Sequence, residues 1–336
     1  MSSDDFSIDV DEAPLELEGE SAIQQRIQRA GVESGPTPPD PDGQPPRRPR
    51  LPLVLLALVM LLAAVEVGAT LVQHARVPSD ADWNAAARKV RAERKPGEPV
   101  LFAPHWVAPL GRLHLGDQLP MELQLLSDVD RYPRVFEVSI RGARHPWLEG
   151  QRATSSWQLG GVRVALYQRP TPAQVRFDFT HNVRQAQVTR IGRDVVHCPF
   201  RATDSRFACD PARGWNWVGS YLAEVNHQPY RCIFVNPVDG HVMRITFPAV
   251  VLGGSLVGYT GIDDFENRKR SKEPVLLKTL VGPRQVGAIQ HQNDWPWHRF
   301  TIDTHELAGQ THPVSFEVTA TRAYARSFCF SAETRK

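Results

Sequence analysis

Residues 51–73 read LPLVLLALVMLLAAVEVGATLVQ, an apolar run whose one charged residue is Glu66. A helix rises about 1.5 Å per residue, so a run of this length reaches across the roughly 30 Å hydrocarbon layer of a bilayer. The run therefore predicts one transmembrane helix, which divides the chain into a short N-terminal part and a large C-terminal part. We expect everything after residue 73 to work at a cell envelope or surface.

The 50 residues before this run predict a disordered tail. They contain eleven acidic and five basic residues, for a net charge of −6, and residues 36–49 are rich in proline. A segment that is highly charged and poor in apolar residues buries too little surface to offset its chain entropy. A short docking helix over residues 20–30 is the alternative, with Ile23 and Ile27 on one face.

The apolar run has the features of a signal anchor rather than of a cleaved signal peptide. A signal peptide has an apolar core of about 7–15 residues, whereas this run is longer and follows a 50-residue tail. Basic residues cluster at its N-terminal end (RRPR, residues 47–50), while Arg76, Arg88 and Lys89 are more spread out beyond its other end. The positive-inside rule then places the N-terminus in the cytoplasm and the C-terminal part in the periplasm or outside the cell.

Glu66 suggests a helix–helix contact inside the membrane. An ionisable group is costly in hydrocarbon and commonly faces a partner or water. It lies between Ala64 and Gly68, which have the small-xxx-small spacing that lets two helices approach closely. The sequence therefore suggests a homodimer or a membrane-protein partner that contacts these three residues. The alternative is a Glu66 that is protonated or that reaches toward the lipid headgroups.

The C-terminal part is mildly basic. The whole chain has a net charge of +2, and the tail together with Glu66 supplies −7, so the remaining residues carry +9. The basic residues do not cluster on one helix or stripe, so we expect no nucleic-acid partner. This charge is compatible with an anionic envelope glycan or with a lipid surface.

All four cysteines lie after the apolar run, which predicts disulfide bonds in an oxidising compartment. Successive spacings of 11, 23 and 97 residues contain no CxxC pair, so we do not expect a zinc site. Four cysteines allow three pairings. We favour a local Cys198–Cys209 bond together with a Cys232–Cys329 bond.

Residues 80–168 predict a small α/β domain. Helical and strand patterns alternate along this segment, which favours parallel strands. The expected elements are helices over residues 80–95 and 119–127, and strands over residues 100–103, 134–140 and 162–168.

Residues 170–336 predict an all-β sandwich of the jelly-roll type. Around ten short alternating runs follow one another, separated by turn residues. We expect no helix in this segment. The predicted fold class is thus a single-pass membrane protein with a disordered tail (1–50), a transmembrane helix (51–73), a small α/β domain (80–168) and a β-sandwich (170–336).

Several of these segments resemble known protein families. The stretch from Asp82-Trp83 to Gly97, followed by PVLFAPHW, is similar to the soluble α/β domain that follows the membrane helices of multi-spanning, lipid-linked-sugar glycosyltransferases. RYPRVFEVSI and GGVRVALYQ resemble other strands of that domain, so this likeness covers about residues 83–168. The later stretches VNPVDGHVMRITFPAVVLGGSLVGYTGI and HPVSFEVTATRAYARSFCFSAE resemble a galactose-binding-like jelly roll of the carbohydrate-binding kind.

The resemblance implies a role in glycan assembly or export. This chain has one predicted span, whereas those transferases use many spans to build a lipid-facing active site. We therefore expect a stand-alone accessory or binding subunit that takes an envelope glycan. The sequence contains no phosphate loop, HExxH helix or GxSxG elbow.

One candidate site follows the first predicted strand of the α/β domain. The loop there contains His105, Trp106, Arg112, His114 and Asp117. Ligands often bind beyond the carboxyl ends of such strands, so these residues could line a cleft. The alternative is that they are packing and solvated groups of a loop.

Two tryptophan pairs form the other candidate sites, Trp215 with Trp217 and Trp295 with Trp297. On an extended strand, residues i and i+2 share one face, so each pair would make a flat platform for the C–H face of a sugar. Such pairs also fill sandwich cores. Pro296 favours an exposed loop or edge for the second pair. The polar and aromatic neighbours that would complete these carbohydrate sites are Asn293, His298 and Tyr221.

We expect no catalytic residue, metal or cofactor. Asp263 and Asp264 offer carboxylate oxygens for a structural calcium ion, but a basic run follows at residues 268–270, and a polar loop of mixed charge is the alternative. The leading interpretation is a non-catalytic, envelope-anchored carbohydrate-binding protein. The other interpretations are a glycan-active transferase or hydrolase that uses the α/β cleft, and a structural assembly subunit.

Overall fold

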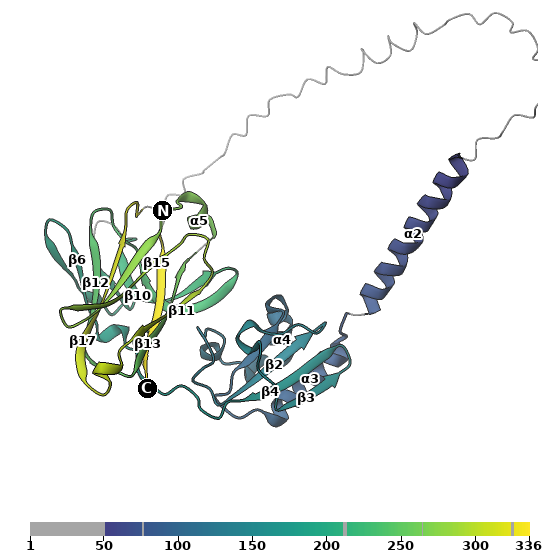
Figure 1. The fold of residues 1–336 in the computed structure, drawn as a ribbon, viewed down its shortest axis with the longest axis horizontal. Helices are drawn as coiled ribbons and strands as arrows, with labels where there is room; N and C mark the ends of the chain where they lie inside the picture. Colours follow the sequence, from purple (N-terminus) through teal and green to yellow (C-terminus); the bar gives the residue numbers. More distant parts are fainter. Residues whose placement is uncertain (1–50, 76, 211–213, 264, 324–325) are drawn as a thin grey trace, which may run out of the picture. The chain divides into compact units, whose positions relative to one another are not determined.

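The computed structural model describes residues 51–75, 77–210, 214–263, 265–323 and 326–336. The chain divides into two units at Gly68, and residues 69–336 form the larger one. The predicted tail, with the alternative helix over residues 20–30, lies outside the described residues. The first described element is α2 (Leu51–Ala75), drawn in purple in Figure 1. Within it, Leu53–Val72 has a mean hydropathy of 2.5, which makes it long and apolar enough to cross a membrane.

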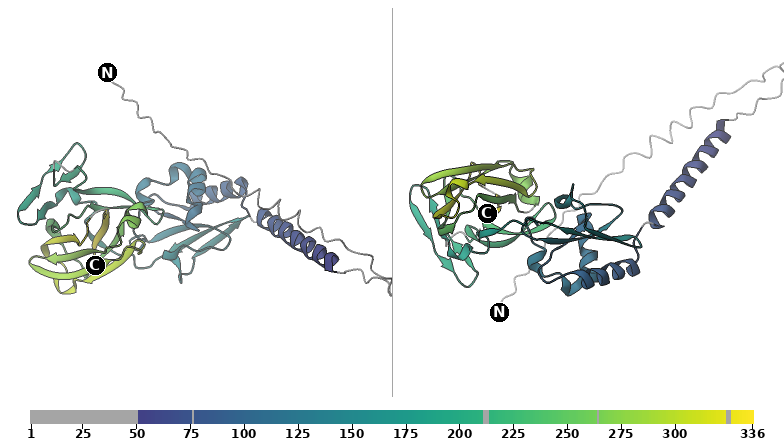
Figure 2. Two further views of the ribbon diagram at one scale, coloured as in Figure 1. Left: turned by 90° about the horizontal axis from the view of Figure 1, so that it is seen from above. Right: turned by 60° about the horizontal axis from the view of Figure 1, so that its bottom comes forward.

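Helix α3 (Asp80–Glu93) begins at a capping box. The Ser79 Oγ accepts a hydrogen bond from the Asp82 N–H (3.3 Å), and the Ser79 N–H donates to the Asp82 carboxylate (3.0 Å). The helix buries Trp83 and Val90 against a four-stranded sheet and ends just before Pro96. Helices α3 and α4 (Ala108–Leu115) both cover one face of this sheet (Figure 2).

The four-stranded sheet is mixed rather than parallel. Its order is β1 (Val100–Ala103), β2 (Arg134–Ile140), β4 (Val162–Gln168) and β3 (Ser155–Leu159). Only β1 and β2 are parallel, whereas β4 is antiparallel to β2 and to β3. The prediction of parallel strands was therefore wrong for β4, because β3 and β4 form a hairpin at the edge of the sheet.

Two further predictions in this region were also wrong: one predicted helix does not form, and one predicted loop is a helix. The expected helix over residues 119–127 is reduced to one 3-10 turn, Met121–Leu123, and the Leu125 carbonyl accepts a hydrogen bond from Arg231 of the sandwich instead (3.2 Å). Helix α4 forms where we expected a loop. Its Gly111 lies against the Phe102 ring, where a Cβ would approach within 1.9 Å. Close helix–strand packing, rather than a turn, explains this glycine.

The sandwich consists of two packed sheets, as predicted. The larger sheet contains β16 (His298–Asp303), β13 (Ser255–Ile262), β18 (Phe328–Arg335), β11 (Gln228–Val235), β10 (Trp217–Val225), β9 (Arg206–Ala208) and β8 (Phe200–Arg201), with β5 (Val175–Asp178) paired to β18. The smaller sheet contains β15 (Arg284–His291), β14 (Val275–Val281), β17 (Thr311–Ala320), β12 (Val242–Val251), β6 (Gln187–Ile191) and β7 (Val195–Cys198). One short helix, α5 (Phe265–Arg270), corrects the expectation that this segment is free of helix.

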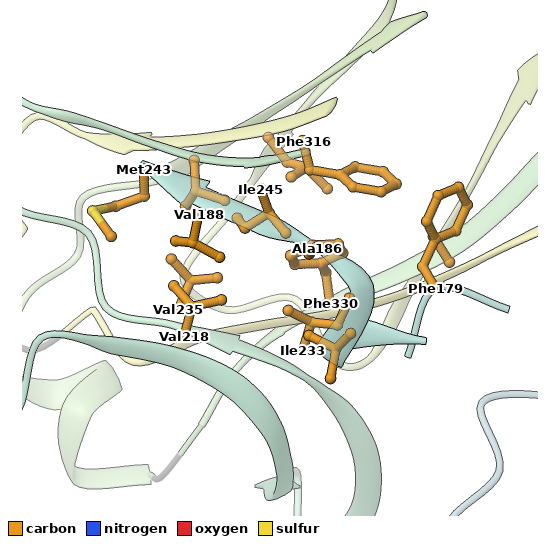
Figure 3. Packing of buried hydrophobic residues seen from close by; sticks show 14 of the residues in the cluster. Phe179, Ala186, Val188, Val218, Ile233, Val235, Met243, Ile245, Phe316 and Phe330 are labelled. Carbon is orange, nitrogen blue, oxygen red and sulfur yellow. The ribbon is translucent and has the colours of Figure 1, made fainter. Parts of the chain in front are cut away.

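Alternating side chains from both sheets form the sandwich core (Figure 3). Phe179 lies edge-on to Phe316 with ring centroids 4.9 Å apart, and Phe330 of the larger sheet reaches the same cluster. Because successive residues of a strand point to opposite faces, the inward position of Phe330 on β18 turns Glu333 and Arg335 outward. These two outward residues meet the α/β domain.

Both predicted disulfide bonds are present. The Cys198–Cys209 bond joins β7 of the smaller sheet to the residue after β9 of the larger sheet. The Cys232–Cys329 bond joins the paired strands β11 and β18. The first bond therefore connects the two sheets, and the second bond links two neighbouring strands within the larger sheet.

Candidate functional site

A cleft of about 480 Å³ lies where the α/β domain meets the sandwich. One wall consists of the loops that follow β1 and β2, and the other consists of the start of β11 together with Pro296. The side chains that give it chemical character are His105, Arg112, Arg144, His145, Trp147 and Tyr230.

The strand arrangement explains the position of this cleft. Strands β1 and β2 are parallel, so their carboxyl ends lie at the same edge of the sheet. The residues after β1 include His105, and those after β2 include Arg144 and Trp147. In α/β sheets, ligands bind in the crevice outside these strand ends.

The structure brings only part of the predicted cleft set together. His105 and Arg112 line the cleft. Trp106 has 57% of its surface exposed and does not line it. His114 packs instead against α3, with its ring centroid 6.0 Å from that of Trp83. The side chain of Asp117 lies outside the described part of the structure.

Sequence reasoning missed Arg144, His145 and Trp147 because they lie between the strands predicted over residues 134–140 and 162–168, where we expected no helix or strand. The His145 N–H donates to the carboxyl group of Glu137 (2.7 Å), and the His145 Nδ1 accepts from the Trp147 N–H (3.2 Å). Burial, with a smaller effect of His105, lowers the pKa of His145 to about 4. These residues could have been found from the sequence, because a basic and aromatic stretch follows directly after a strand, β2, that is parallel to β1.

The carboxyl group of Glu137 holds the loop after β2 in place by accepting the hydrogen bond from the His145 N–H. Its side chain is fully buried and accepts hydrogen bonds from the Tyr167 hydroxyl (3.0 Å) and from Arg163 (3.3 Å). The Nε of Arg144 lies 3.9 Å from the same carboxyl group. Two arginines therefore share one carboxylate, so the positive charge of Arg144 is only partly balanced.

The other lining arginine has weaker partners. The Arg112 Nε lies 3.4 Å from the side-chain oxygen of Gln124, at the long end of a hydrogen bond, and Arg112 forms no ion pair with any described residue. No aspartate or glutamate occurs among the described residues that line the cleft. The cleft therefore has an excess of positive charge.

The second tryptophan pair lies beside this cleft but does not form a shared platform. Trp295 and Trp297 occupy the turn between β15 and β16, not an extended strand, so strand alternation does not bring them to one face. Trp297 stacks on the Tyr230 ring, with centroids 4.7 Å apart, and Trp295 stacks on His298 at 4.0 Å. Trp297 therefore supports Tyr230, which lines the cleft.

Asn293 has a structural role in the same turn. Its side-chain oxygen accepts a hydrogen bond from Arg326 (2.7 Å), and its nitrogen donates to the Arg268 carbonyl (3.0 Å). These bonds fix the turn that presents Pro296 to the cleft.

The first tryptophan pair is divided in a similar way. Trp215 lies in a turn and is 49% exposed, while Trp217 begins β10 and stacks on Phe234 with ring centroids 4.3 Å apart. Tyr221, four residues along the same strand, is 39% exposed and lies 5.6 Å from Trp217 between ring centroids. Trp217 and Tyr221 thus form a partly exposed aromatic patch on the outward face of the larger sheet.

The structure describes only one of the two aspartates named for the calcium alternative. The Asp263 carboxylate accepts a hydrogen bond from the Glu224 N–H (2.8 Å), and Asp264 lies outside the described residues. The described residues contain no group of three or more acidic, histidine or cysteine side chains that could hold a metal ion.

The α/β domain meets the sandwich at a second place, which we call the closed junction: residues 125–131 against β18 and its neighbours. The Arg335 side chain is only 6% exposed and binds the carboxylates of Asp128 (2.7 Å), Asp130 (3.1 Å) and Glu333 (3.1 Å). Arg131 pairs with Glu333 and, at 3.2 Å, with Asp178. A cavity of only about 50 Å³ remains there.

Asp128 of the closed junction is held in its charged form by its partners. The Tyr259 hydroxyl donates to Asp128 (2.7 Å). Burial alone raises the pKa of Asp128, but the charge of Arg335 and the Tyr259 hydrogen bond outweigh burial, so the pKa lies below the ordinary value of 3.8. The junction is therefore an arrangement of matched charges.

No protein-family model and no curated protein matches this chain. A solved structure of the CBM51-2 domain in complex with GlcNAc and INT domains of Clostridium perfringens ZmpB is 11% identical, covers 36% of this chain and 28% of that chain, and gives a TM-score of 0.28. The tandem CBM51 modules of Sp3GH98, the family 98 glycoside hydrolase of Streptococcus pneumoniae SP3-BS71, are 7% identical, with coverages of 53% and 56% and a TM-score of 0.28.

A third structure, the CBM22-1–GH10 modules of a Clostridium thermocellum xylanase with xylohexaose, is 12% identical, with coverages of 49% and 28% and a TM-score of 0.26. All three contain carbohydrate-binding modules, the class that the jelly-roll resemblance named. They give no support to the glycosyltransferase resemblance of residues 83–168. At these TM-scores the likeness is too weak to define the ligand of this chain.

Proposed function

We propose that this protein is a membrane-anchored, extracytoplasmic carbohydrate-binding protein that is accessory to glycan assembly or export, and that the cleft is its binding site. One observation carries the proposal: the cleft combines aromatic walls with planar hydrogen-bonding side chains from both parts of the chain. Tyr230 and Trp147 offer ring faces, and Gln124, Gln228 and Arg144 offer polar groups.

This combination suits a sugar. The C–H face of a pyranose is apolar and packs on an aromatic ring, while its hydroxyl groups need donors and acceptors in fixed positions. Tyr230 is held by its stack on Trp297, so it is ordered before a ligand arrives. Ordering a wall in advance lowers the entropic cost of binding.

A binding role fits the lining better than glycoside hydrolysis does. Most glycosidases need two carboxyl groups that face each other across the scissile bond. The described residues that line the cleft include neither aspartate nor glutamate, and the buried Glu137 is committed to Tyr167 and Arg163.

The membrane anchor is the second part of the proposal. Helix α2 is apolar on all sides, and its Leu53–Val72 segment is not buried by any described part of the chain. A helix that is apolar all round belongs in a protein core or in a membrane. Two disulfide bonds support an oxidising compartment for the C-terminal unit. Association through Glu66, Ala64 and Gly68, with a second copy or another membrane protein, is part of the same proposal.

A binding comparison tests the proposed site. Full-length protein in non-ionic detergent is applied to an array of bacterial envelope saccharides, alongside the variants Tyr230→Ala and Tyr221→Ala. We expect Tyr230→Ala to lose at least about tenfold in affinity, which corresponds to about 1.4 kcal/mol. Tyr221→Ala is the matched control because it removes a partly exposed tyrosine of the neighbouring strand outside the cleft.

Two results would contradict the proposal. Loss of binding in Tyr221→Ala but not in Tyr230→Ala would move the site to the patch of Trp217 and Tyr221. No binding of the folded full-length protein to any saccharide would refute the carbohydrate function itself. Tyr230→Phe, which keeps the ring, serves to separate stacking from a general loss of folding.

A further inference from the structure

The arginines of this chain fall into two groups where the α/β domain meets the sandwich. In the closed junction, Arg335 is surrounded by three carboxylates, all within 3.1 Å. In the cleft, Arg112 forms no ion pair with a described residue, and Arg144 shares the Glu137 carboxyl group with Arg163, which lies closer to it. The charge of the cleft arginines is therefore not fully balanced by the residues that the structure describes.

His145 does not supply the same charge. His145 accepts a hydrogen bond at Nδ1 from the Trp147 backbone, an arrangement that requires this nitrogen to be unprotonated. Its low pKa is consistent with a neutral ring at ordinary pH. Arg112 and Arg144, whose guanidinium groups stay charged at all ordinary pH values, supply fixed positive charge to the cleft.

A concave wall of low polarity strengthens the field of such charges. Phe102, Trp147, Tyr230 and Pro296 line the cleft beside the two arginines. Low-dielectric walls focus the field and raise the local concentration of an anion. The planar guanidinium group also matches a carboxylate or phosphate group with two parallel hydrogen bonds.

We infer that the cleft selects acidic saccharides, whose carboxylate or phosphate group is bound by Arg112 and Arg144 while a sugar ring packs on Tyr230. This inference rests on the proposed function and specifies the substrate class of the same site. The shared chemistry is an oxyanion carried by a sugar, whether it comes from a uronic acid or from a sugar phosphate.

The test compares matched probes on full-length protein in non-ionic detergent. The probes are a tetramer of galacturonic acid, the same tetramer after reduction of its carboxyl groups, galactose 1-phosphate and galactose. We expect the acidic tetramer to bind at least about tenfold more tightly than the reduced tetramer, because hydrogen bonds to charged groups are the stronger kind. Galactose 1-phosphate against galactose shows whether phosphate replaces carboxylate.

The arginine variants locate the effect. Arg112→Gln and Arg144→Gln should each remove most of the preference for the acidic probe and leave the reduced tetramer little changed. Arg152→Gln is the control, since Arg152 is exposed on the same domain and does not line the cleft. Because Arg144 also donates to the Gln151 carbonyl (2.8 Å), melting curves of all variants accompany the binding data, and Arg112→Gln carries the test if Arg144→Gln unfolds.

The failures are distinguishable. Equal affinity for the acidic and reduced tetramers would overturn the inference and leave carbohydrate binding in place. An unchanged acidic preference in both folded arginine variants would also overturn it. If none of the probes binds while neutral glycans of the array do, the inference fails alone; if nothing binds at all, the proposed function fails with it.

Discussion

The α/β domain and the sandwich meet in two places that use charge in opposite ways. In the closed junction, Arg335 and Arg131 are matched by carboxylates from both parts of the chain, and almost no space remains. In the cleft, neither Arg112 nor Arg144 has a carboxylate of its own among the described residues, and a volume of about 480 Å³ is open to a ligand. The same two parts of the chain thus form one contact in which the arginine charges are paired with carboxylates and one in which they are not fully paired.

This difference distinguishes arginines that stabilise the fold from arginines that are available to bind a ligand. A buried charge with several partners is costly to disturb, because its removal leaves the partners uncompensated. A charge at the wall of an open cleft has solvent in place of a partner, so its removal leaves the fold unaffected. Stability and binding should therefore respond to different arginines.

The largest effect is expected from Arg335→Met. The change removes the one charge shared by Asp128, Asp130 and Glu333 in a nearly buried position. We expect a loss of about 3–5 kcal/mol in the free energy of unfolding, measured by urea denaturation followed by tryptophan fluorescence. Arg193→Met, at an exposed position of the sandwich, is the control. A loss below about 1 kcal/mol would show that the closed junction does not hold the two parts together.

An intermediate effect is expected from acid through His145. Its pKa is lowered to about 4 in the folded protein, so the folded state favours the neutral ring. The stability that His145 contributes is complete above its unfolded pKa of about 6.5 and is lost as the pH falls from there to about 4. We expect this contribution to be about 3 kcal/mol, because each pKa unit corresponds to about 1.4 kcal/mol, and His145→Gln should flatten the stability curve in that window.

Asp128 of the closed junction should respond to acid in a different window. The pKa of Asp128 lies below 3.8, so its contribution to stability is lost only as the pH falls below that value. If wild type and His145→Gln lose stability in parallel between pH 6.5 and 4, the histidine is not buried as described.

The smallest effect on stability is expected from the double variant Arg112→Gln/Arg144→Gln. We expect the free energy of unfolding to change by no more than about 0.5 kcal/mol, since neither arginine has a fully committed carboxylate. A melting curve and urea denaturation check this. A large loss of stability would place these arginines with Arg335, and the contrast between the two regions would disappear.

The sequence predicted those features that depend on local pattern. The helix after Ser79, the strands over residues 100–103, 134–140 and 162–168, and the alternating runs of the sandwich all follow from periodicity and caps. Both disulfide bonds were favoured correctly from spacing and compartment. The structure of the tail stays a prediction.

The errors arose where contacts over long sequence distances decide the structure. Residues 105–117 were expected to form a loop, although Gly111 lets helix α4 pack closely on Phe102. The W-x-W spacing of residues 295–297 suggested a shared face, which requires a strand that the turn at Pro296 does not provide. Half of the cleft could not be found from local pattern, because Tyr230 and Pro296 meet the loop of His105 only after the two parts pack together.

The most direct test of the cleft is hydrogen–deuterium exchange of full-length protein in non-ionic detergent, with and without the galacturonic acid tetramer. We predict slower exchange in residues 104–112 and 141–147, the two loops that contribute to the cleft, and unchanged exchange in residues 128–131 of the closed junction, which do not line it. Protection confined to residues 215–222, or no change on binding in either cleft loop, would contradict the assignment of this cleft as the carbohydrate site.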